Sequence, residues 1–355
     1  MATEATQGSQ TSVSSNGATL LELKNLKMHF PITNPGLLRK VVGHVKAVDG
    51  ASLTVKAGET FALVGESGCG KTTLGRCIIR IYQPTEGEIN YVEPDGTVVD
   101  LATVQGKGFI PYRRAIRMIF QDPYSSLNPR RKVLQIVGEP LVRNKIASGS
   151  ELEDRVADLL RKVGLRPEYM LRYPHAFSGG ERQRIGVARA LALNPRLVIA
   201  DEAVSALDVS VQAQILNLLQ ELQAEFDLTY IFVAHDLSVV EHIADRVAVM
   251  YVGKLVEVGT RQQIFTAPKH PYTEALMSAV PKPDPRLRDA GARIRLTGEV
   301  ADPANPPSGC YFHPRCRYAQ NRCKAEGPAL RDIGRGHHVA CYFAEQLELK
   351  GVAGM

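Results

Sequence analysis

The sequence has no uncharged apolar run of the ~18–20 residues that a membrane-spanning helix needs. Its N-terminus, MATEATQGSQTSVSSNGAT, lacks the basic start and the apolar stretch of a secretory signal. A charged fraction of 23% excludes wholesale disorder and a fibrous protein, and no internal repeat is visible. We therefore expect a soluble, cytosolic protein whose 355 residues form one large domain or two modest ones.

The net charge of +6 is modest, and most of it lies near the C-terminus. Residues 281–341 hold 11 basic and 6 acidic side chains, a surplus of five positive charges. A basic segment can attract nucleic acid or anionic lipid. Here the basic residues are interleaved with acids and prolines, which favours a solvated basic surface.

The amino-acid composition and the hydrophobic pattern change along the chain and divide it into parts. Residues 1–19 are rich in Ser, Thr, Gln and Ala and are expected to be disordered. From residue 20 to 280, strand-like and helix-like segments alternate, which predicts an α/β domain on a mostly parallel sheet. Within it, residues 125–195 are expected to form a helical subdomain. Residues 281–355, rich in Pro, Arg, Gly and Cys, predict a loop-rich C-terminal extension.

A glycine-rich loop between an apolar strand and a helical segment matches the P-loop pattern of nucleotide-binding proteins. It runs through Gly65, Glu66, Ser67, Gly68, Cys69, Gly70, Lys71 and Thr72, and Thr73 follows in the helix. The glycines let backbone N–H groups turn inward around a phosphate at the positive end of the helix. Lys71 is expected to reach the β- and γ-phosphates, and the Thr72 hydroxyl to bind Mg²⁺.

Two acids at the end of a second apolar strand supply the other half of such a site. The strand Leu197–Ala200 ends in Asp201 and Glu202. Asp201 is expected to hold Mg²⁺ through water, and Glu202 to orient or deprotonate the attacking water. The alternative is a buried strand that merely ends in a capping acid. The presence of the P-loop favours the magnesium and water roles over this alternative. His235 ends another apolar strand and is ambiguous by itself.

The segment Phe177-Ser-Gly-Gly-Glu-Arg-Gln183 resembles the signature motif of ATP-binding cassette (ABC) ATPases. Gln121, the segment Ser205–Asp208 and His235 are similar to the family's Q-loop, D-loop and switch histidine, in the family's order. Phe30 stands where the family has an adenine-stacking aromatic residue, although a core aromatic is the alternative. The similarity spans residues 20–280 and implies catalytic roles for Lys71, Gln121, Glu202 and His235.

The resemblance implies that two such domains meet head to tail, with each ATP held between one P-loop and the partner's signature motif. Nucleotide contacts are then implied for Ser178, Gly179, Gly180 and Glu181, and for Asp208. Gln121 is implied as a ligand of Mg²⁺ together with Thr72 and Asp201. A lone chain is expected to bind ATP but to hydrolyse it poorly.

Four further stretches resemble the ATPases of di- and oligopeptide importers: residues 121–130, 173–177, 270–276 and 305–310. The chain looks most like the second ATPase of a dipeptide importer. This implies a heterodimer with a homologous ATPase, two membrane permeases, an indirect extracytoplasmic peptide-binding protein and a place on the cytoplasmic face of the membrane. The rival is a soluble ABC ATPase acting on nucleic acid or ribosomes. Such proteins usually carry two cassettes or a coiled-coil insertion, which this chain lacks.

Four cysteines cluster in the extension with the spacing C-x5-C-x6-C-x17-C: Cys310, Cys316, Cys323 and Cys341. Disulfides do not suit a reducing cytosol. Four thiolates suit a [4Fe–4S] cluster or Zn²⁺, and the tight C-x2-4-C pairs usual for zinc are absent. Related peptide importers carry a similar set, which favours the iron–sulfur cluster as a structural staple. Zinc and free thiols remain the alternatives.

Overall fold

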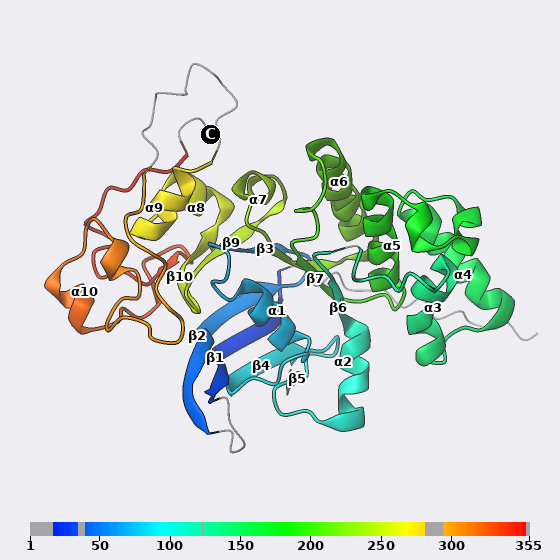
Figure 1. Ribbon diagram of the computed structural model, residues 1–355, viewed down its shortest axis with the longest axis horizontal. Coiled ribbons are helices and arrows are strands. Elements are labelled where there is room, and N and C mark those ends of the chain that lie inside the picture. The colour runs from blue at the N-terminus through cyan, green and yellow to red at the C-terminus, as the bar shows by residue number, and fades with distance from the viewer. Residues whose placement is uncertain (1–16, 35–39, 123, 281–293, 353–355) are drawn as a thin grey trace, which may run out of the picture.

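The computed structural model describes residues 17–34, 40–122, 124–280 and 294–352, so the expected disordered segment lies outside it up to residue 16. Order begins slightly earlier than expected, because the first strand starts at Thr19 and the Ala18 carbonyl accepts a hydrogen bond from the Ala57 N–H. Figure 1 shows two sheets in the middle, a group of helices on one side and the C-terminal extension on the other.

A large mixed sheet carries most of the fold, with the strand order β11-β12-β10-β9-β3-β8-β7-β6. Strands β9, β3, β8, β7 and β6 run parallel, and β10, β12 and β11 continue the sheet antiparallel. In chain order the strands are β3 (Thr60–Val64), β6 (Ile116–Ile119), β7 (Leu197–Asp201), β8 (Thr229–Val233), β9 (Arg246–Tyr251), β10 (Lys254–Thr260), β11 (Arg331–Asp332) and β12 (His338–Val339).

A smaller antiparallel sheet packs beside it, with the order β2-β1-β4-β5. Its strands are β1 (Thr19–Thr33), β2 (Val41–Lys56), β4 (Glu86–Val92) and β5 (Val98–Asp100). The α-helices are α1 (Lys71–Ile78), α2 (Ile110–Ala115), α3 (Val133–Arg143), α4 (Gly149–Lys162), α5 (Gly179–Leu191), α6 (Val209–Phe226), α7 (Leu237–Ile243), α8 (Arg261–Thr266), α9 (Pro271–Met277) and α10 (Asn321–Ala325). None of the helices in the described ranges is both long and apolar enough to span a bilayer.

The central strands of the large sheet are buried on both faces, which explains their continuous apolar runs. Alternate residues of β3 belong to two different cores. Phe61 and Leu63 pack in the core shared with the small sheet and α1, whereas Ala62 and Val64 pack in the core shared with the helices α3–α6. The sheet is therefore held rigid from both sides, and its loop ends can carry a precise site.

The C-terminal extension has few regular elements, but it is joined to the large sheet. Strand β12 pairs with β10 through Glu257↔Val339 and Val258↔His338. The Glu257 carboxylate, fully buried, accepts hydrogen bonds from the His337 ring at 2.7 Å and from the His270 N–H at 3.0 Å. A buried acid with several hydrogen-bond partners fixes the extension firmly onto the edge of the sheet.

Candidate functional site

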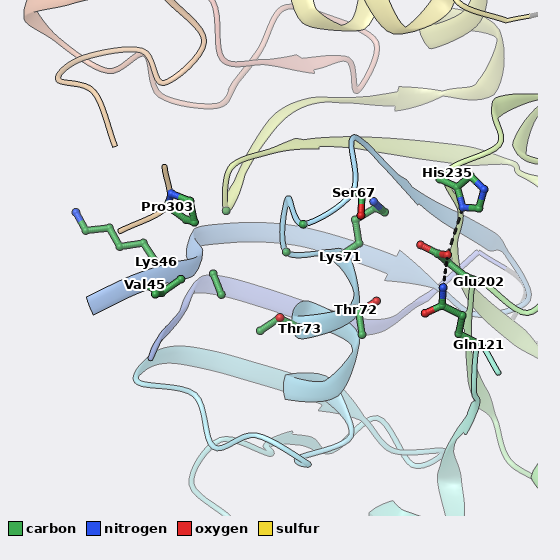
Figure 2. A pocket seen from close by; sticks show the side chains of 14 residues that line it. Val45, Lys46, Ser67, Lys71, Thr72, Thr73, Gln121, Glu202, His235 and Pro303 are labelled. Carbon is green, nitrogen blue, oxygen red and sulfur yellow. Dashed lines mark hydrogen bonds and ion pairs between the residues drawn. The ribbon is translucent and has the colours of Figure 1, made fainter. Parts of the chain in front are cut away.

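A cavity of about 520 Å³ lies where several parallel strands end. It is lined by Val45, Lys46, Ala47, Ser67, Gly68, Gly70, Lys71, Thr72, Thr73, Gln121, Glu202, His235, Gly253 and Pro303. Figure 2 shows Gln121, Glu202 and His235 at one end of the cavity and Val45, Lys46 and Pro303 at the other. The carboxyl ends of β3, β8, β7 and β6 meet at this edge, the usual place for a ligand on an open α/β sheet.

The glycine-rich loop connects β3 to α1 and forms the floor of the cavity. Gly65 and Gly70 have φ angles of 150° and 109°, and a Cβ on Gly70 would collide with the Ala47 carbonyl oxygen, so only glycine fits there. Gly70 caps α1 without any side-chain hydrogen bond, and the first turn of the helix contains no acid. Free N–H groups at the positive end of a helix make a site for an anion.

Lys71 lies within the curve of this loop. Its ammonium group donates to the carbonyl oxygens of Gly65, at 2.8 Å, and of Glu66, at 3.1 Å, and only 4% of the residue is exposed. These two hydrogen bonds hold the Lys71 ammonium group close to the free N–H groups at the start of α1. The loop therefore combines backbone donors with one positive charge, which suits a phosphate group.

Thr72 and Asp201 meet beside the loop, although they are far apart in the sequence. The Thr72 hydroxyl donates to the Asp201 carboxylate at 2.7 Å. Asp201 is 1% exposed, and burial raises the pKa of its carboxyl above the ordinary value, against the lowering effect of the Thr72 hydroxyl. A hydroxyl and a carboxylate oxygen in contact are ligands that Mg²⁺ accepts.

Glu202 is the meeting point of three loops. Its Oε2 atom lies 2.7 Å from the Gln121 amide nitrogen and 3.2 Å from His235 Nδ1. Gln121 follows β6, Glu202 follows β7 and His235 follows β8, so neighbouring strands deliver the three side chains to one point. Glu202 has a φ of 45°, an uncommon conformation for a non-glycine residue, and it lines the cavity.

The predicted signature residues lie outside this cavity. Ser178 is exposed and caps α5: its hydroxyl accepts from the Glu181 N–H at 3.3 Å, and the Glu181 carboxylate accepts from the Ser178 N–H at 2.9 Å. Gly180 approaches α6 so closely that a Cβ would lie 2.5 Å from Val211. Asp208 stands at the start of α6 and, like Gly179, is not among the residues that line the cavity.

Phe30 is also not among the lining residues. It lies on β1, and its ring meets that of Tyr82 edge-on with 5.2 Å between centroids. The structure thus places it in an aromatic pair rather than on the cavity wall. At the end of the cavity remote from Glu202, the apolar surface comes from Val45 and Pro303 instead.

Sequence reasoning missed Val45, Lys46, Ala47, Gly253 and Pro303 as lining residues. Pro303 comes from the extension, and its carbonyl accepts a hydrogen bond from the Lys46 N–H at 3.0 Å. None of these residues belongs to a recognisable motif, because each contributes backbone or apolar surface. The position of Val45 and Lys46 shortly before the P-loop strand is the one signal that could have suggested them.

The four cysteines of the extension surround a second, small cavity. None of them is in a disulfide. Burial raises the pKa of the Cys316 thiol to about 12 and of the Cys341 thiol to about 11, with a further rise from the neighbouring cysteines. In the part of the chain that the structure describes, no group of three or more His, Cys, Asp or Glu side chains is arranged to hold a metal ion. The site is thus a cavity lined by thiols rather than a formed set of ligands.

Comparison with known proteins gives one consistent result. Residues 48–205 match the family model described as ABC transporter, and residues 256–323 match the oligopeptide/dipeptide transporter C-terminal region. The oligopeptide transport ATP-binding protein AppF of Bacillus subtilis is 51% identical, over 92% of this chain and 98% of its own length. The dipeptide transport ATP-binding protein DppF of Escherichia coli is 49% identical, over 93% and 96%. A dimeric ATP-binding cassette in a post-hydrolysis state, bound to ADP and Pi, superposes with a TM-score of 0.58 at 28% identity, over 68% of this chain and 99% of that chain.

Proposed function

The chain belongs to the ATP-binding subunits of ABC oligopeptide and dipeptide transporters, and on that premise we propose that it powers the import of short peptides. Membership of this family makes it an ATPase that uses ATP and Mg²⁺, as the motifs predicted. The peptide-transport relatives favour this function over a soluble ABC ATPase acting on nucleic acid or ribosomes. The proposed substrate class is supported by these relatives and by the match of residues 256–323 to the oligopeptide/dipeptide transporter C-terminal region.

The side chains that line the cavity, and Asp201 beside Thr72, each have a role that their position supports. The N–H groups of the loop and Lys71 bind the β- and γ-phosphates, and Glu202 orients the water that attacks the γ-phosphate. His235 stabilises the charge that develops there. Thr72 and Asp201, with Gln121, would hold Mg²⁺, which when bound neutralises charge on the phosphate oxygens.

Hydrolysis requires a second subunit in this proposal. The cavity has phosphate donors on the P-loop side, whereas the signature residues 178–181 and Asp208 lie outside it. We assign them to the ATP held by a partner in a head-to-tail dimer. The exposed start of α5 supports this assignment, because a partner's γ-phosphate can reach it from solvent. The Phe30 position supports stacking on adenine less well, because its ring is already paired with Tyr82.

The division of the chain follows the same reasoning. We assign residues 20–280 to the ABC ATP-binding domain, residues 125–195 to a helical subdomain that contacts two permeases, and residues 281–355 to the extension. Gln121 lines the cavity, and α3 is the next helix along the chain, which suits the transmission of ATP-driven closure to the permeases. The partner ATPase is a homologous, distinct chain, and both ATPases sit at the cytoplasmic face of the membrane. On the opposite side, an extracytoplasmic binding protein delivers the peptide to the permeases.

The observation that carries the function is that Gln121, Glu202 and His235 meet beside the P-loop, where the start of α1 has no side-chain cap. The test is ATP hydrolysis by the complex of this chain with its partner ATPase and permeases in lipid vesicles. We expect hydrolysis and peptide uptake to rise together when a short peptide and its binding protein are supplied. A Glu202→Gln complex should bind ATP normally and transport nothing. Hydrolysis stimulated by ribosomes or nucleic acid, and unaffected by peptide, would contradict the proposal.

We also assign Cys310, Cys316, Cys323 and Cys341 to a [4Fe–4S] cluster. The support for this assignment is that all four thiols line one cavity, although they come from separate segments of the extension. A cluster would cross-link a segment that has little core of its own. Iron and zinc analysis of anaerobically purified protein, with absorbance near ~400 nm for the cluster, tests the assignment. Zinc, or colourless protein with free thiols, would contradict it.

A further inference from the structure

The C-terminal extension reaches the phosphate-binding loop directly. Arg315 of the extension forms a two-pronged ion pair with Glu66 of the loop: Nη1 lies 2.8 Å from Oε2, and Nη2 lies 3.2 Å from Oε1. The Arg315 side chain is 8% exposed and that of Glu66 is 29% exposed. Bidentate pairs of this kind are stronger and more directional than ordinary surface ion pairs, because two parallel bonds fix the plane of both groups.

Glu66 is fixed at its backbone as well. Its N–H donates to the Tyr272 hydroxyl at 2.9 Å, and its carbonyl oxygen accepts from Lys71. The Tyr272 ring packs against Phe312 of the extension, with centroids 5.3 Å apart. One residue of the loop therefore links the extension on one side to the phosphate-binding lysine on the other.

A carboxylate in a phosphate-binding loop creates an electrostatic problem. Held by Arg315, Glu66 is not among the residues that line the cavity. A negative charge turned into the cavity would repel bound phosphates, and this repulsion grows where water is partly excluded. Arg315 neutralises the Glu66 carboxylate and holds it in a fixed direction. Without this partner, the carboxylate would be free to turn toward the cavity and to compete for Lys71.

On the basis of the proposed function, we propose that Arg315 is a positioning residue of the phosphate-binding loop. It acts on ATP through Glu66 and does not itself line the cavity. Arg315 is followed directly by Cys316, which lines the thiol cavity. The segment that contacts the phosphate-binding loop through Arg315 therefore also carries one of the four thiols.

The test measures binding of a fluorescent N-methylanthraniloyl derivative of ATP, with Mg²⁺, to the full-length chain. We expect Arg315→Gln to weaken binding by about tenfold, the scale of a lost charged hydrogen-bond pair. Arg317→Gln is the matched control, because Arg317 also flanks Cys316 and pairs with a cassette carboxylate, that of Glu274 at 2.9 Å, without touching the loop. The affinity of the Arg317→Gln variant for the ATP derivative should stay within about twofold of wild type, even where its thermal stability is lower.

A double-mutant cycle decides whether Arg315 acts through Glu66. In a Glu66→Gln background, Arg315→Gln should change affinity by less than about twofold, because the charge to be neutralised is gone. An equal loss in both backgrounds, or no loss in either, would overturn the inference. If Arg315→Gln does not fold, Arg315→Lys carries the test: it keeps the charge but loses the second prong, so an affinity equal to wild type would count against positioning. A wild-type chain that binds no nucleotide would instead refute the proposed function.

Discussion

Two glycine-bearing helix starts in this protein offer their backbone N–H groups in different ways. At α1, Gly70 adopts a left-handed conformation and no side chain caps the helix, so its donors open into the cavity. At α5, Ser178 and Glu181 cap each other, and the helix start faces solvent. The start of α1 lies at the cavity and its N–H groups are available to an anion. The start of α5 is exposed to solvent and is capped by its own side chains.

In the proposed function, this difference is the reason why one chain can hold ATP while two are needed to hydrolyse it. An enclosed, uncapped helix start already pays the cost of leaving its donors without partners, and a phosphate relieves it. An exposed, capped start gains less from a free phosphate, because the Glu181 carboxylate already satisfies the Ser178 N–H and adds a negative charge. We expect α5 to bind a phosphate only when a partner subunit presents it at close range.

The largest predicted effect separates the two helix starts by mutation. Lys71→Ala should weaken binding of the fluorescent ATP derivative to the isolated chain by about 100-fold, because the loop loses its buried charge. Ser178→Arg should leave that affinity within about twofold of wild type, yet lower hydrolysis by the assembled transporter by about 100-fold. Titration of each variant and steady-state ATPase assays measure both.

Thr260→Arg is the control for the Ser178 substitution. Thr260 caps α8 with the same type of capping box, through Gln263, and lies outside the cavity. It should change neither binding nor hydrolysis. If Ser178→Arg weakened binding to the isolated chain as much as Lys71→Ala does, the two helix starts would belong to one site, and the distinction between them would fail.

The parts of the site that could be predicted are those written in local sequence patterns. The loop from Gly65 to Thr72 follows an apolar strand and opens a helix, and Asp201 and Glu202 end another such strand. Parallel strands bring their carboxyl ends together, so these segments converge once the fold class is right. The fold class and the family were confirmed for this reason.

The remaining features depend on contacts that leave no local pattern. Pro303 and Arg315 reach the nucleotide cavity and its loop from a segment without periodicity, and their partners lie more than 240 residues earlier. Strands β11 and β12 contain two residues each, too few to show alternation. Phe30 could be placed by order along the chain, but its pairing with Tyr82 is a property of the packed structure.

A third helix start extends the comparison, because its cap can be titrated. His270 is 1% exposed, and its Nδ1 accepts a hydrogen bond from the Tyr272 N–H at the start of α9. Burial lowers the pKa of His270 to about 3. The unfolded chain binds a proton near pH ~6.5 while the folded chain does not, so stability is unaffected above that pH and falls as the pH drops below it.

Below about pH 6.5, the free energy of unfolding should fall by about 1.4 kcal/mol per pH unit because of His270. The variant His270→Asn keeps a cap that can accept the same N–H but cannot be protonated in this range. Urea unfolding of wild type and variant between about pH 7.5 and pH 5 measures the difference between their free energies of unfolding. This difference should be constant above about pH 6.5 and should increasingly favour the variant at lower pH. A difference independent of pH would show that His270 is not held neutral.

The smallest predicted effect tests whether the cap at α5 is as tight as the structure shows. Glu181→Ala removes the acceptor of the Ser178 N–H and should lower the free energy of unfolding by about 1 kcal/mol. Glu181→Gln keeps an acceptor and should lose less, while Gln263→Ala, at the capping box of α8, should lose a similar amount to Glu181→Ala. Urea midpoints at constant slope measure all three. If Glu181→Ala cost nothing while Gln263→Ala cost the expected amount, the start of α5 would be as open as that of α1, and exposure alone would separate them.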